Sequence, residues 1–481
     1  MSKTFKTIFV VVFFVICTAP LVLMPFFKND VSLEKRELNP FPSYIEDGKI
    51  NRSFSDGFEA WYNDRLPFRA QILTAANFLK GEELHSPTSN VIIGKEGWLY
   101  YVQEGEDYMA TNVMTEEEAG AFAITLSLIQ ENIEGRGGNF TFVPMSNKAS
   151  VYGEYMPSCY RKADRNNLSM VTEEMKKAGV NFVDMKNVLT SNKDKGVLYH
   201  RRDSHWNYLG ALYGFDAIME SLGRDHRDYD KESYDMVKTW RGDLDKLIYP
   251  AGGVMDYQYE FDFEHCDFVF TDPRGVRDSE EQLAIFMSDR EEGDDQFSTK
   301  NRELSDGSSI YMARDSFGRA LLPYVIDSYE NATFKRTDCP NVQSIEDGSD
   351  MVYEIGERNL RKIIAKAPFM FAPERDSSYS DGKTASGETK ISYKSEGYGS
   401  HIYGALPGDF DIKDGRVYIE ISGEGASRVY EAFPILESEL SGQGETRGFS
   451  AYFSKDTLPE GEYDIKIIAG DMVFDGGRID L

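Results

Sequence analysis

Hydrophobic positions in the central part of the chain follow two patterns, a helical period of about 3.6 residues and short apolar runs that are typical of buried strands. The predicted helices are 116–134, 167–179, 205–223, 316–329 and 356–365, and the predicted strands are 139–146, 180–185, 308–313 and 350–355. Gly179 and Gly223 stand where two of these helices would end in a C-cap. Alternation of this kind is typical of a parallel sheet covered by helices, so the sequence predicts an α/β fold.

The segments on either side have other patterns. Residues 56–80 read as helical after Pro67, and residues 91–101 read as a hairpin with Gly94 and Gly97 at its turn. Residues 375–390 are rich in Ser, Gly and charge, which indicates a linker. Beyond them, short strands are separated by turns, and this predicts an all-β sandwich; the strands are 416–422, 428–436, 448–454, 463–470 and 472–481.

The N-terminus carries a long apolar run. Thr7 to Phe27 contains no charged residue, and Lys3 and Lys6 precede it. This length is sufficient for a helix that spans a bilayer, and the early lysines favour an N-terminus on the inside. We expect a membrane anchor here rather than a cleaved signal peptide, because no small-x-small site closes the run.

Charge and cysteine content exclude several classes of function. The net charge of −28 argues against nucleic-acid binding, which needs a basic surface. The six histidines show no paired spacing of the kind that binds zinc, so no metal and no cofactor are expected. Three cysteines lie outside the apolar run, and they allow one disulfide at most.

Candidate chemistry first appears in the segment 202–206. Asp203 and His205 are two residues apart, so in an extended backbone their side chains point the same way. A carboxylate beside an imidazole can hold its tautomer and stabilise the imidazolium, which a general base in acyl transfer requires. The alternative is that Asp203 or Ser204 caps the helix that follows and that His205 packs against it.

The second candidate segment is 312–318. Ser316 stands between a predicted strand and a predicted helix, where the helix N-terminus offers unpaired N–H groups to a developing oxyanion. The alternative is an ordinary N-cap serine. Both segments place their polar group at a strand end that feeds a helix, and in an open α/β sheet such ends gather on one edge. The sequence therefore predicts that Ser316, His205 and Asp203 meet.

Several blocks in order resemble those of the SGNH-hydrolase-like family of alginate O-acetyltransferases and its relatives named for an Asp-His-His-Trp motif. Asp203-Ser204-His205-Trp206 is similar to the Asp-x-His-Trp signature, and Asp315-Ser316-Phe317 is similar to the nucleophile block. Further similar blocks are 63–69, 94–100 and 143–157. The resemblance covers residues 55–365.

The resemblance implies a nucleophile at Ser316, a general base at His205 and an orienting carboxylate at Asp203. It also implies an exported polysaccharide as acceptor and a membrane-bound O-acyltransferase as the supplier of acetyl groups. Two positions depart from the family. Arg314 replaces a glycine before Asp-Ser, which puts the oxyanion hole in doubt, and Ser204 replaces the first histidine of the motif.

Other positions have weaker arguments. Asn147 and Lys148 follow a predicted strand and belong to a matching block, so they are candidates for substrate or oxyanion contacts, with capping as the alternative. Arg314 is a candidate for the same role. Tyr353 and Arg358 flank the last predicted strand and could reach the site, although packing is the favoured role for Tyr353.

The predicted organisation is a membrane anchor (1–28), a connector with a helical lead-in (29–90), an SGNH-like catalytic domain (91–374), a linker (375–390) and a β-sandwich (391–481). The acidic stretch 224–300 reads as an insertion over the site. We expect an extracytoplasmic O-acetyltransferase of polysaccharide. The alternatives are a carbohydrate acetylesterase and a non-catalytic glycan-binding or assembly protein on the same fold. The β-rich tail is either a glycan-binding module or a structural cap.

Overall fold

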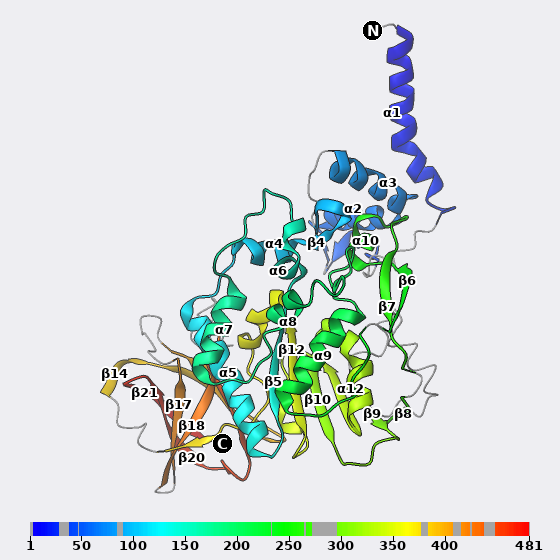
Figure 1. Ribbon diagram of the computed structural model, residues 1–481. Coiled ribbons are helices and arrows are strands. Elements are labelled where there is room, and N and C mark those ends of the chain that lie inside the picture. Colours follow the sequence, from blue (N-terminus) through cyan, green and yellow to red (C-terminus); the bar gives the residue numbers. More distant parts are fainter. Residues whose placement is uncertain are drawn as a thin grey trace.

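The computed structural model describes residues 3–27, 38–46, 48–83, 90–231, 233–263, 266–271, 296–376, 383–406, 415–423, 426–436 and 448–480. Figure 1 shows an elongated arrangement, with helix α1 at one end, a helix-covered sheet in the middle and a β-rich region at the other end.

The central element is a six-stranded sheet with the strand order β5-β12-β10-β11-β9-β8. Its first four strands are parallel: β5 (Phe140–Met145), β12 (Asp350–Gly356), β10 (Ser309–Arg314) and β11 (Asn331–Arg336). Strand β9 (Gln296–Asn301) pairs antiparallel with β11, and β8 (Phe268–Phe270) pairs antiparallel with β9. The carboxyl ends of β5, β12 and β10 therefore meet at one edge of the sheet, which is where sites form in open α/β sheets.

Helices cover both faces of this sheet (Figure 1). Helices α5 (Glu116–Gly135) and α7 (Asn167–Ala178) share one hydrophobic core with one set of strand side chains, namely Phe140, Phe142, Tyr311, Ala313, Met351, Tyr353 and Ile355. Helices α9 (Tyr208–Leu222) and α12 (Leu322–Ser328) share the opposite core with Val143, Met145, Ile310, Met312 and Val352. The side-chain period of two in each strand thus decides which face a residue joins.

Most of the predicted elements are present, and two helices end as expected, with Gly179 and Gly223 in the left-handed conformation. The predicted strand 180–185 is wrong. Only an isolated bridge joins Phe182 to Phe142, because the Asp184 side chain caps helix α8 (Met185–Ser191) and ends the extended segment.

Other boundaries differ from the prediction. The helix expected after Pro67 is present as α3 (Arg69–Phe78), and a further helix, α2 (Phe54–Arg65), precedes it. Pro67 and a positive φ of 60° at Phe68 separate the two helices. The helix expected at 316–329 starts as a 3₁₀ turn (η5, Phe317–Leu321), and residues 357–364 are 3₁₀ rather than α-helical (η7, Glu357–Ile364). The expected hairpin is present as β3 (Val91–Ile93) and β4 (Leu99–Tyr101).

The stretch 224–300 contains ordered elements as well as residues 272–295, which lie outside the described part. Besides β8 and the greater part of β9, its described elements are β6 (Asp235–Trp240), α10 (Asp243–Ile248) and β7 (Asp256–Glu260), and β6 and β7 form an antiparallel pair. Short helices α4 (Val102–Met109) and α6 (Lys148–Val151) stand near the carboxyl edge of the sheet.

The C-terminal part is β-rich, as predicted. Its strands follow the order β14-β21-β20-β17-β18-β19-β16-β15, and β13 (Glu374–Arg375) pairs with β18. Their bounds are Lys383–Glu388 (β14), Lys390–Glu396 (β15), Gly399–Ala405 (β16), Val417–Gly423 (β17), Ala426–Ile435 (β18), Gly448–Ser454 (β19), Glu462–Ala469 (β20) and Met472–Asp480 (β21). The linker expected at 375–390 therefore contains strand β14, and its residues 377–382 lie outside the described part.

This β-rich region packs directly on the α/β part. Phe433 and Ile435 of β18 belong to the same core as helix α5. Arg375 joins the two regions electrostatically, because its guanidinium lies 2.5 Å from Glu131 of α5 and 2.7 Å from Glu431 of β18.

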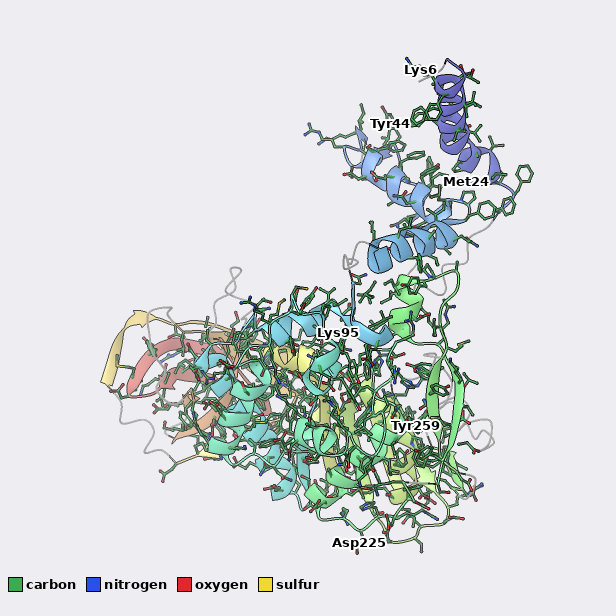
Figure 2. All side chains as sticks on the ribbon, turned by 45° about the horizontal axis from the view of Figure 1, so that its top comes forward. Lys6, Met24, Tyr44, Lys95, Asp225 and Tyr259 are labelled. Carbon is green, nitrogen blue, oxygen red and sulfur yellow. The ribbon has the colours of Figure 1, made fainter. Side chains whose placement is uncertain are left out.

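The N-terminal part is less enclosed. Helix α1 (Lys3–Leu23) stands clear of the body, and Figure 2 marks its course with Lys6 and Met24, away from the packed side chains around Lys95 and Tyr259. Strands β1 (Ile45–Glu46) and β2 (Lys49–Ile50) form a small pair beside α2. Among the described residues, no helix combines the length and the apolarity that crossing a membrane requires, so the anchor expected at 1–28 is not shown.

Two helical glycines test the packing on the two faces of the sheet. A Cβ at Gly214 of α9 would lie 2.5 Å from the Trp206 ring, whereas a Cβ at Gly120 of α5 would meet nothing within 4 Å. We expect Gly214→Ala to lower the free energy of unfolding by about 1–3 kcal/mol through overpacking. The matched variant Gly120→Ala should raise it by about 0.5–1 kcal/mol. Urea unfolding measures both, and a stabilising Gly214→Ala would contradict the tight contact with Trp206.

Candidate active site

Asp203, His205 and Ser316 lie together in a hydrogen-bonded line. His205 Nδ1 is 2.7 Å from Asp203 Oδ1, and His205 Nε2 is 2.8 Å from Ser316 Oγ. Ser316 is the second residue after β10 and directly precedes the 3₁₀ turn, between a strand and a helical segment as the sequence indicated. The structure therefore brings together the three residues that the sequence singled out.

His205 reaches this position by a route different from the expected one. It belongs to a turn between α8 and α9 rather than to a strand end, and α9 begins only at Tyr208 after the N-cap Asn207. The Asp203 carboxylate accepts from the backbone N–H of His205 at 3.0 Å as well as from its ring. This local turn, in which an aspartate binds the N–H two residues ahead, aligns the two side chains.

The second oxygen of Asp203 is held by residues far along the chain. Asp203 Oδ2 accepts from Trp240 Nε1 at 3.1 Å and from the backbone N–H of Asp243 at 2.9 Å. Burial opposes ionisation, but the hydrogen bond and charge of His205 outweigh it and hold the pKa of Asp203 well below its usual value. In the same way, burial opposes protonation of His205, but Asp203 outweighs it and raises the pKa of the imidazole.

Asp243 adds a second carboxylate behind His205. It accepts from the backbone N–H and from the hydroxyl of Ser204, at 2.7 and 2.6 Å, and lies 3.7 Å from His205 Nδ1. Burial, followed by the charge of Asp203, raises the pKa of Asp243. Ligand atoms of Asp203, His205 and Asp243 lie within 4.8 Å of one another, a spacing that a metal ion could use. Each of these groups already takes part in hydrogen bonds, which account for the cluster without an ion.

The turn at Ser316 is fixed by two buried acids. Asp315 Oδ1 accepts from the backbone N–H of Phe317 at 2.8 Å, and its Oδ2 accepts from that of Gly356 at 2.9 Å. Glu354 Oε2 accepts from the N–H groups of Asp315 and Gly318, both at 3.0 Å. The N–H groups of Phe317 and Gly318 are therefore occupied, and the expected cradle of free N–H groups after the nucleophile is not formed by them.

Asn147 and Lys148 do not contact the triad side chains as substrate-binding groups would. Both follow β5 and are fully buried. The Lys148 ammonium donates to the carbonyls of His200, Arg201 and Asp203, so it fixes the turn that carries the triad. The Asn147 amide donates to Asp107 at 2.8 Å. We therefore correct the role expected for both from substrate contact to support.

Arg314 and Tyr353 are also buried. Arg314 has no exposed surface, and its Nη1 donates to the carbonyl of Asp315 at 3.0 Å, so it supports the nucleophile turn from within. Tyr353 lies in the core shared with helix α5, where its ring packs against Phe142, and its hydroxyl donates to the Asp338 carbonyl at 2.7 Å. A substrate contact is excluded for Tyr353, because its position in β12 directs it to the α5 face.

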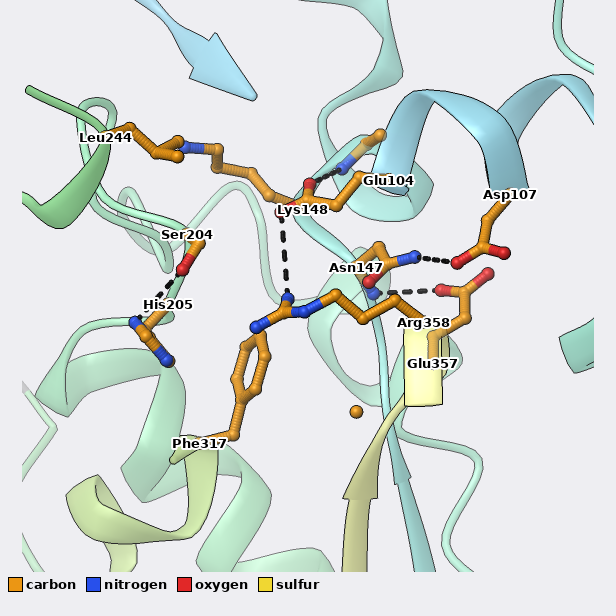
Figure 3. A network of polar contacts seen from close by, with 12 residues as sticks. Glu104, Asp107, Asn147, Lys148, Ser204, His205, Leu244, Phe317, Glu357 and Arg358 are labelled. Atoms are coloured by element: carbon orange, nitrogen blue, oxygen red, sulfur yellow. Dashed lines mark hydrogen bonds and ion pairs between the residues drawn. The ribbon is translucent and has the colours of Figure 1, made fainter. Parts of the chain in front are cut away.

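Arg358 is the cation that faces the site. Its guanidinium lies 5.1 Å from the centre of the Phe317 ring, and that ring lies 4.8 Å from the imidazole of His205. Figure 3 shows the guanidinium above Phe317, with a dashed line from one terminal nitrogen to Glu104. Arg358 is the second residue after the end of β12, near the position from which the sequence suggested that it could reach the site.

Sequence reasoning missed Trp240, Asp243 and Glu354. Trp240 and Asp243 lie in the stretch interpreted as an overhanging insertion, and they support the Asp203 carboxylate instead. No periodicity or short spacing connects them with Asp203. A polar residue within the apolar run 350–355 was the available signal for Glu354, because a carboxyl in a buried strand needs a specific partner.

Comparisons with known proteins agree with the resemblance of the motifs. Residues 91–284 match the family described as SGNH hydrolase-like domain, acetyltransferase AlgX, a stretch that contains Asp203 and His205 and ends before Ser316. Over 180 residues the chain is 24% identical to the probable alginate O-acetylase AlgJ of Pseudomonas aeruginosa, which is 37% of this chain and 44% of the relative. The chain thus spans less than half the length of that relative. The resemblance predicted from the motifs is confirmed over this part.

Two solved structures are similar at low identity. A DHHW family protein from Eubacterium siraeum is 17% identical, with 56% of this chain and 95% of that chain covered and a TM-score of 0.41. PatB1 from Bacillus cereus is 17% identical, with 56% of this chain and 97% of that chain covered and a TM-score of 0.45.

The network behind the site predicts a pH effect on stability. Burial, followed by the charge of Glu357, raises the pKa of Asp107 to about 7. The folded state therefore keeps a proton that the unfolded chain releases near pH 4, and stability falls as the pH rises from about 4 to about 7. The wild type should lose on the order of 1–3 kcal/mol of its free energy of unfolding over this pH range, and Asp107→Asn should not show this loss. Urea unfolding at pH 5 and 7.5 measures it. The exposed control Asp471→Asn should keep the wild-type slope, and an unchanged slope in Asp107→Asn would refute the assignment.

Proposed function

We propose that this protein is a serine-dependent O-acetyltransferase that acts on an extracellular or cell-envelope polysaccharide. The proposal rests on one observation above all, the line of hydrogen bonds from Asp203 through His205 to Ser316 Oγ. The nucleophile, the base and the orienting carboxylate stand in the order that acyl transfer through serine requires. The names of the relatives, an alginate O-acetylase and an acetyltransferase family, support the acetyl group as the transferred unit.

The first half-reaction forms an acetyl-enzyme. Ser316 Oγ attacks the carbonyl carbon of an acetyl ester, its proton moves to Nε2 of His205, and the carbonyl electron pair moves onto oxygen. When this tetrahedral intermediate collapses, the bond to the leaving group breaks, and the leaving oxygen takes the proton from His205. Asp203 keeps the Nδ1 proton in place and stabilises the imidazolium, without being protonated itself.

The second half-reaction runs through the same atoms in reverse. A hydroxyl of the polysaccharide gives its proton to His205 and attacks the acetyl carbon, and Ser316 leaves with that proton when the intermediate collapses. Water in place of the sugar hydroxyl would give an esterase with the same residues. The exposed part of the His205 side chain is 24%, which leaves room for either acceptor.

The proposal includes the division of the chain and its location. We assign the reaction to residues 91–374 and propose an extracytoplasmic position attached to the membrane through residues 1–28. The support is the charge-free run Thr7–Phe27, and fractionation of cells that express the full chain tests it. A membrane-bound O-acyltransferase would supply acetyl groups in this arrangement, and co-purification with such an enzyme is the corresponding test.

Ser316→Ala tests the reaction itself. The wild type should release acetate from a chromogenic acetyl ester and acetylate an added oligosaccharide, and the variant should lose at least about a thousandfold in rate, because no other group replaces the nucleophile. Acetate release and acceptor mass are followed together. Ser328→Ala, whose hydroxyl bonds to the Tyr324 carbonyl on α12, is the matched control and should keep full activity. Ester cleavage without acceptor gain would indicate an esterase, and equal activity of Ser316→Ala and wild type would refute the proposal.

We further propose that the β-rich region holds part of the polysaccharide. A cavity of about 450 Å³ lies between this region and the α/β part. His401 at its wall stacks between Tyr403 and Tyr452, with ring centres 4.6 and 4.1 Å away. Aromatic faces of this kind pack against the C–H face of a sugar ring.

Tyr452→Ala tests this second site. We expect at least about a tenfold loss of oligosaccharide affinity, the equivalent of about 1.4 kcal/mol, with an unchanged rate on the small chromogenic ester. Calorimetric titration measures the affinity. Tyr393→Ala, an exposed tyrosine on β15, is the control and should bind like the wild type. Unchanged affinity in Tyr452→Ala would leave the region as a structural cap.

A further inference from the structure

Two backbone N–H groups that directly follow Ser316 are already occupied by carboxylates. In serine acyl transfer, the backbone N–H of the residue after the nucleophile commonly binds the negative oxygen of the tetrahedral intermediate. Here that N–H, of Phe317, donates to the Asp315 carboxylate at 2.8 Å, and the next N–H, of Gly318, donates to Glu354 at 3.0 Å. Both donors would have to leave a buried acid in order to serve an oxyanion. The negative charge that develops on the carbonyl oxygen therefore needs a donor other than these two N–H groups.

Arg358 has the charge and the place for this task. Its side chain is only 11% exposed, and its guanidinium packs on the Phe317 ring, the neighbour of the nucleophile. The same ring contacts the imidazole of His205, so cation, ring and base are held as one stack.

The Arg358 guanidinium also has N–H groups that make no hydrogen bond to a described residue. Among the described residues, the structure records no hydrogen bond from its guanidinium, and its Nη1 is a buried donor without a partner. Its ion pair with Glu104 Oε1 spans 3.9 Å, too long for a hydrogen bond, and that oxygen is also unpaired. Nη1 is the nitrogen on the Glu104 side, so the donor left for an anion is the other terminal nitrogen, Nη2, from which no hydrogen bond to a described residue is recorded either. A charged donor that lacks a partner in a largely buried site can gain free energy by binding an anion.

Glu104 keeps this cation in position. It is fully buried, and its other carboxylate oxygen accepts from the backbone N–H of Ala149 at 3.3 Å, so it cannot follow Arg358 into the site. Figure 3 shows Glu104 on one side of the guanidinium and Phe317 below it, with the second terminal nitrogen turned toward the side of His205. The Nη1 edge of the guanidinium is therefore held near Glu104, and the Nη2 edge can donate to a group in the site.

We propose that Arg358 donates a hydrogen bond to the oxyanion of the tetrahedral intermediate and replaces the occupied backbone N–H groups. This inference rests on the proposed function and specifies how the same site stabilises its transition state. As the Ser316 Oγ–carbon bond forms, the carbonyl electron pair moves onto oxygen, and the guanidinium binds that negative charge without giving up its own proton. The charge on the oxygen disappears again when the leaving group departs. A donor aimed at such an oxygen is worth about 10²–10³ in rate.

The test measures hydrolysis of a neutral aryl acetate by the full chain and by Arg358→Ala, Arg358→Lys and Ser316→Ala. We expect Arg358→Ala to lower kcat by about 10²–10³ with KM little changed, because the interaction forms only in the transition state. Arg358→Lys should keep part of the rate, and millimolar guanidinium should restore part of it to Arg358→Ala but not to Ser316→Ala. Arg361→Ala, three residues along η7 and paired with Glu118, is the matched control and should retain wild-type kcat.

Each outcome decides one question. Wild-type kcat in Arg358→Ala, with Ser316-dependent activity intact, would overturn the inference and leave the proposed function standing. A loss without guanidinium rescue and with a lowered melting temperature would assign Arg358 a structural role. Activity that does not depend on Ser316 would overturn the proposed function together with the inference.

Discussion

The buried carboxylate of Asp203 is the interaction on which the rest of the site depends. Only 3% of Asp203 is exposed, so its charge must be balanced within the protein. Four N–H donors do so: the backbone and ring of His205, the indole of Trp240 and the backbone of Asp243. Two of these donors come from the segment that follows α9, which means that the orientation of His205 depends on a remote part of the chain.

The buried Lys148 holds the turn that carries this carboxylate. Its ammonium binds three carbonyls of the turn 200–203, including that of Asp203 itself, and these bonds fix the backbone from which the carboxylate projects. Gly242 completes the enclosure, because a Cβ there would lie 2.1 Å from the carbonyl oxygen of Arg202. The backbone of residues 200–203, the Lys148 ammonium and the Asp203 carboxylate thus form one support. Ser204, which stands where the motif has a histidine, joins this support by hydrogen bonds to Asp243.

The sequence predicted the parts of this arrangement that local patterns encode. Alternating periods predicted the parallel sheet, and the motifs around His205 and Ser316 predicted that these residues meet. The support of Asp203 by Trp240 could not be predicted, because a contact across 37 residues leaves no periodicity. The role of Tyr353 also remained open, since the period of two in a strand that is buried on both faces does not say which face holds the site. Arg314 was expected at the substrate or the oxyanion, and its buried position could not be predicted because the hydrogen bond of its guanidinium to the Asp315 carbonyl arises only in the folded turn.

The order of the strands in the sheet has a consequence for how the protein is made. Strand β12 is the last of the six in the chain, yet it lies between β5 and β10. Glu354 and Gly356, which fix the turn of Ser316, belong to this strand. The first 349 residues of the chain contain Asp203, His205 and Ser316 but not β12. A nascent chain of this length therefore lacks the strand that binds the backbone of the Ser316 turn. The backbone bonds that β12 makes to the Ser316 turn can therefore form only after this central strand has been synthesised.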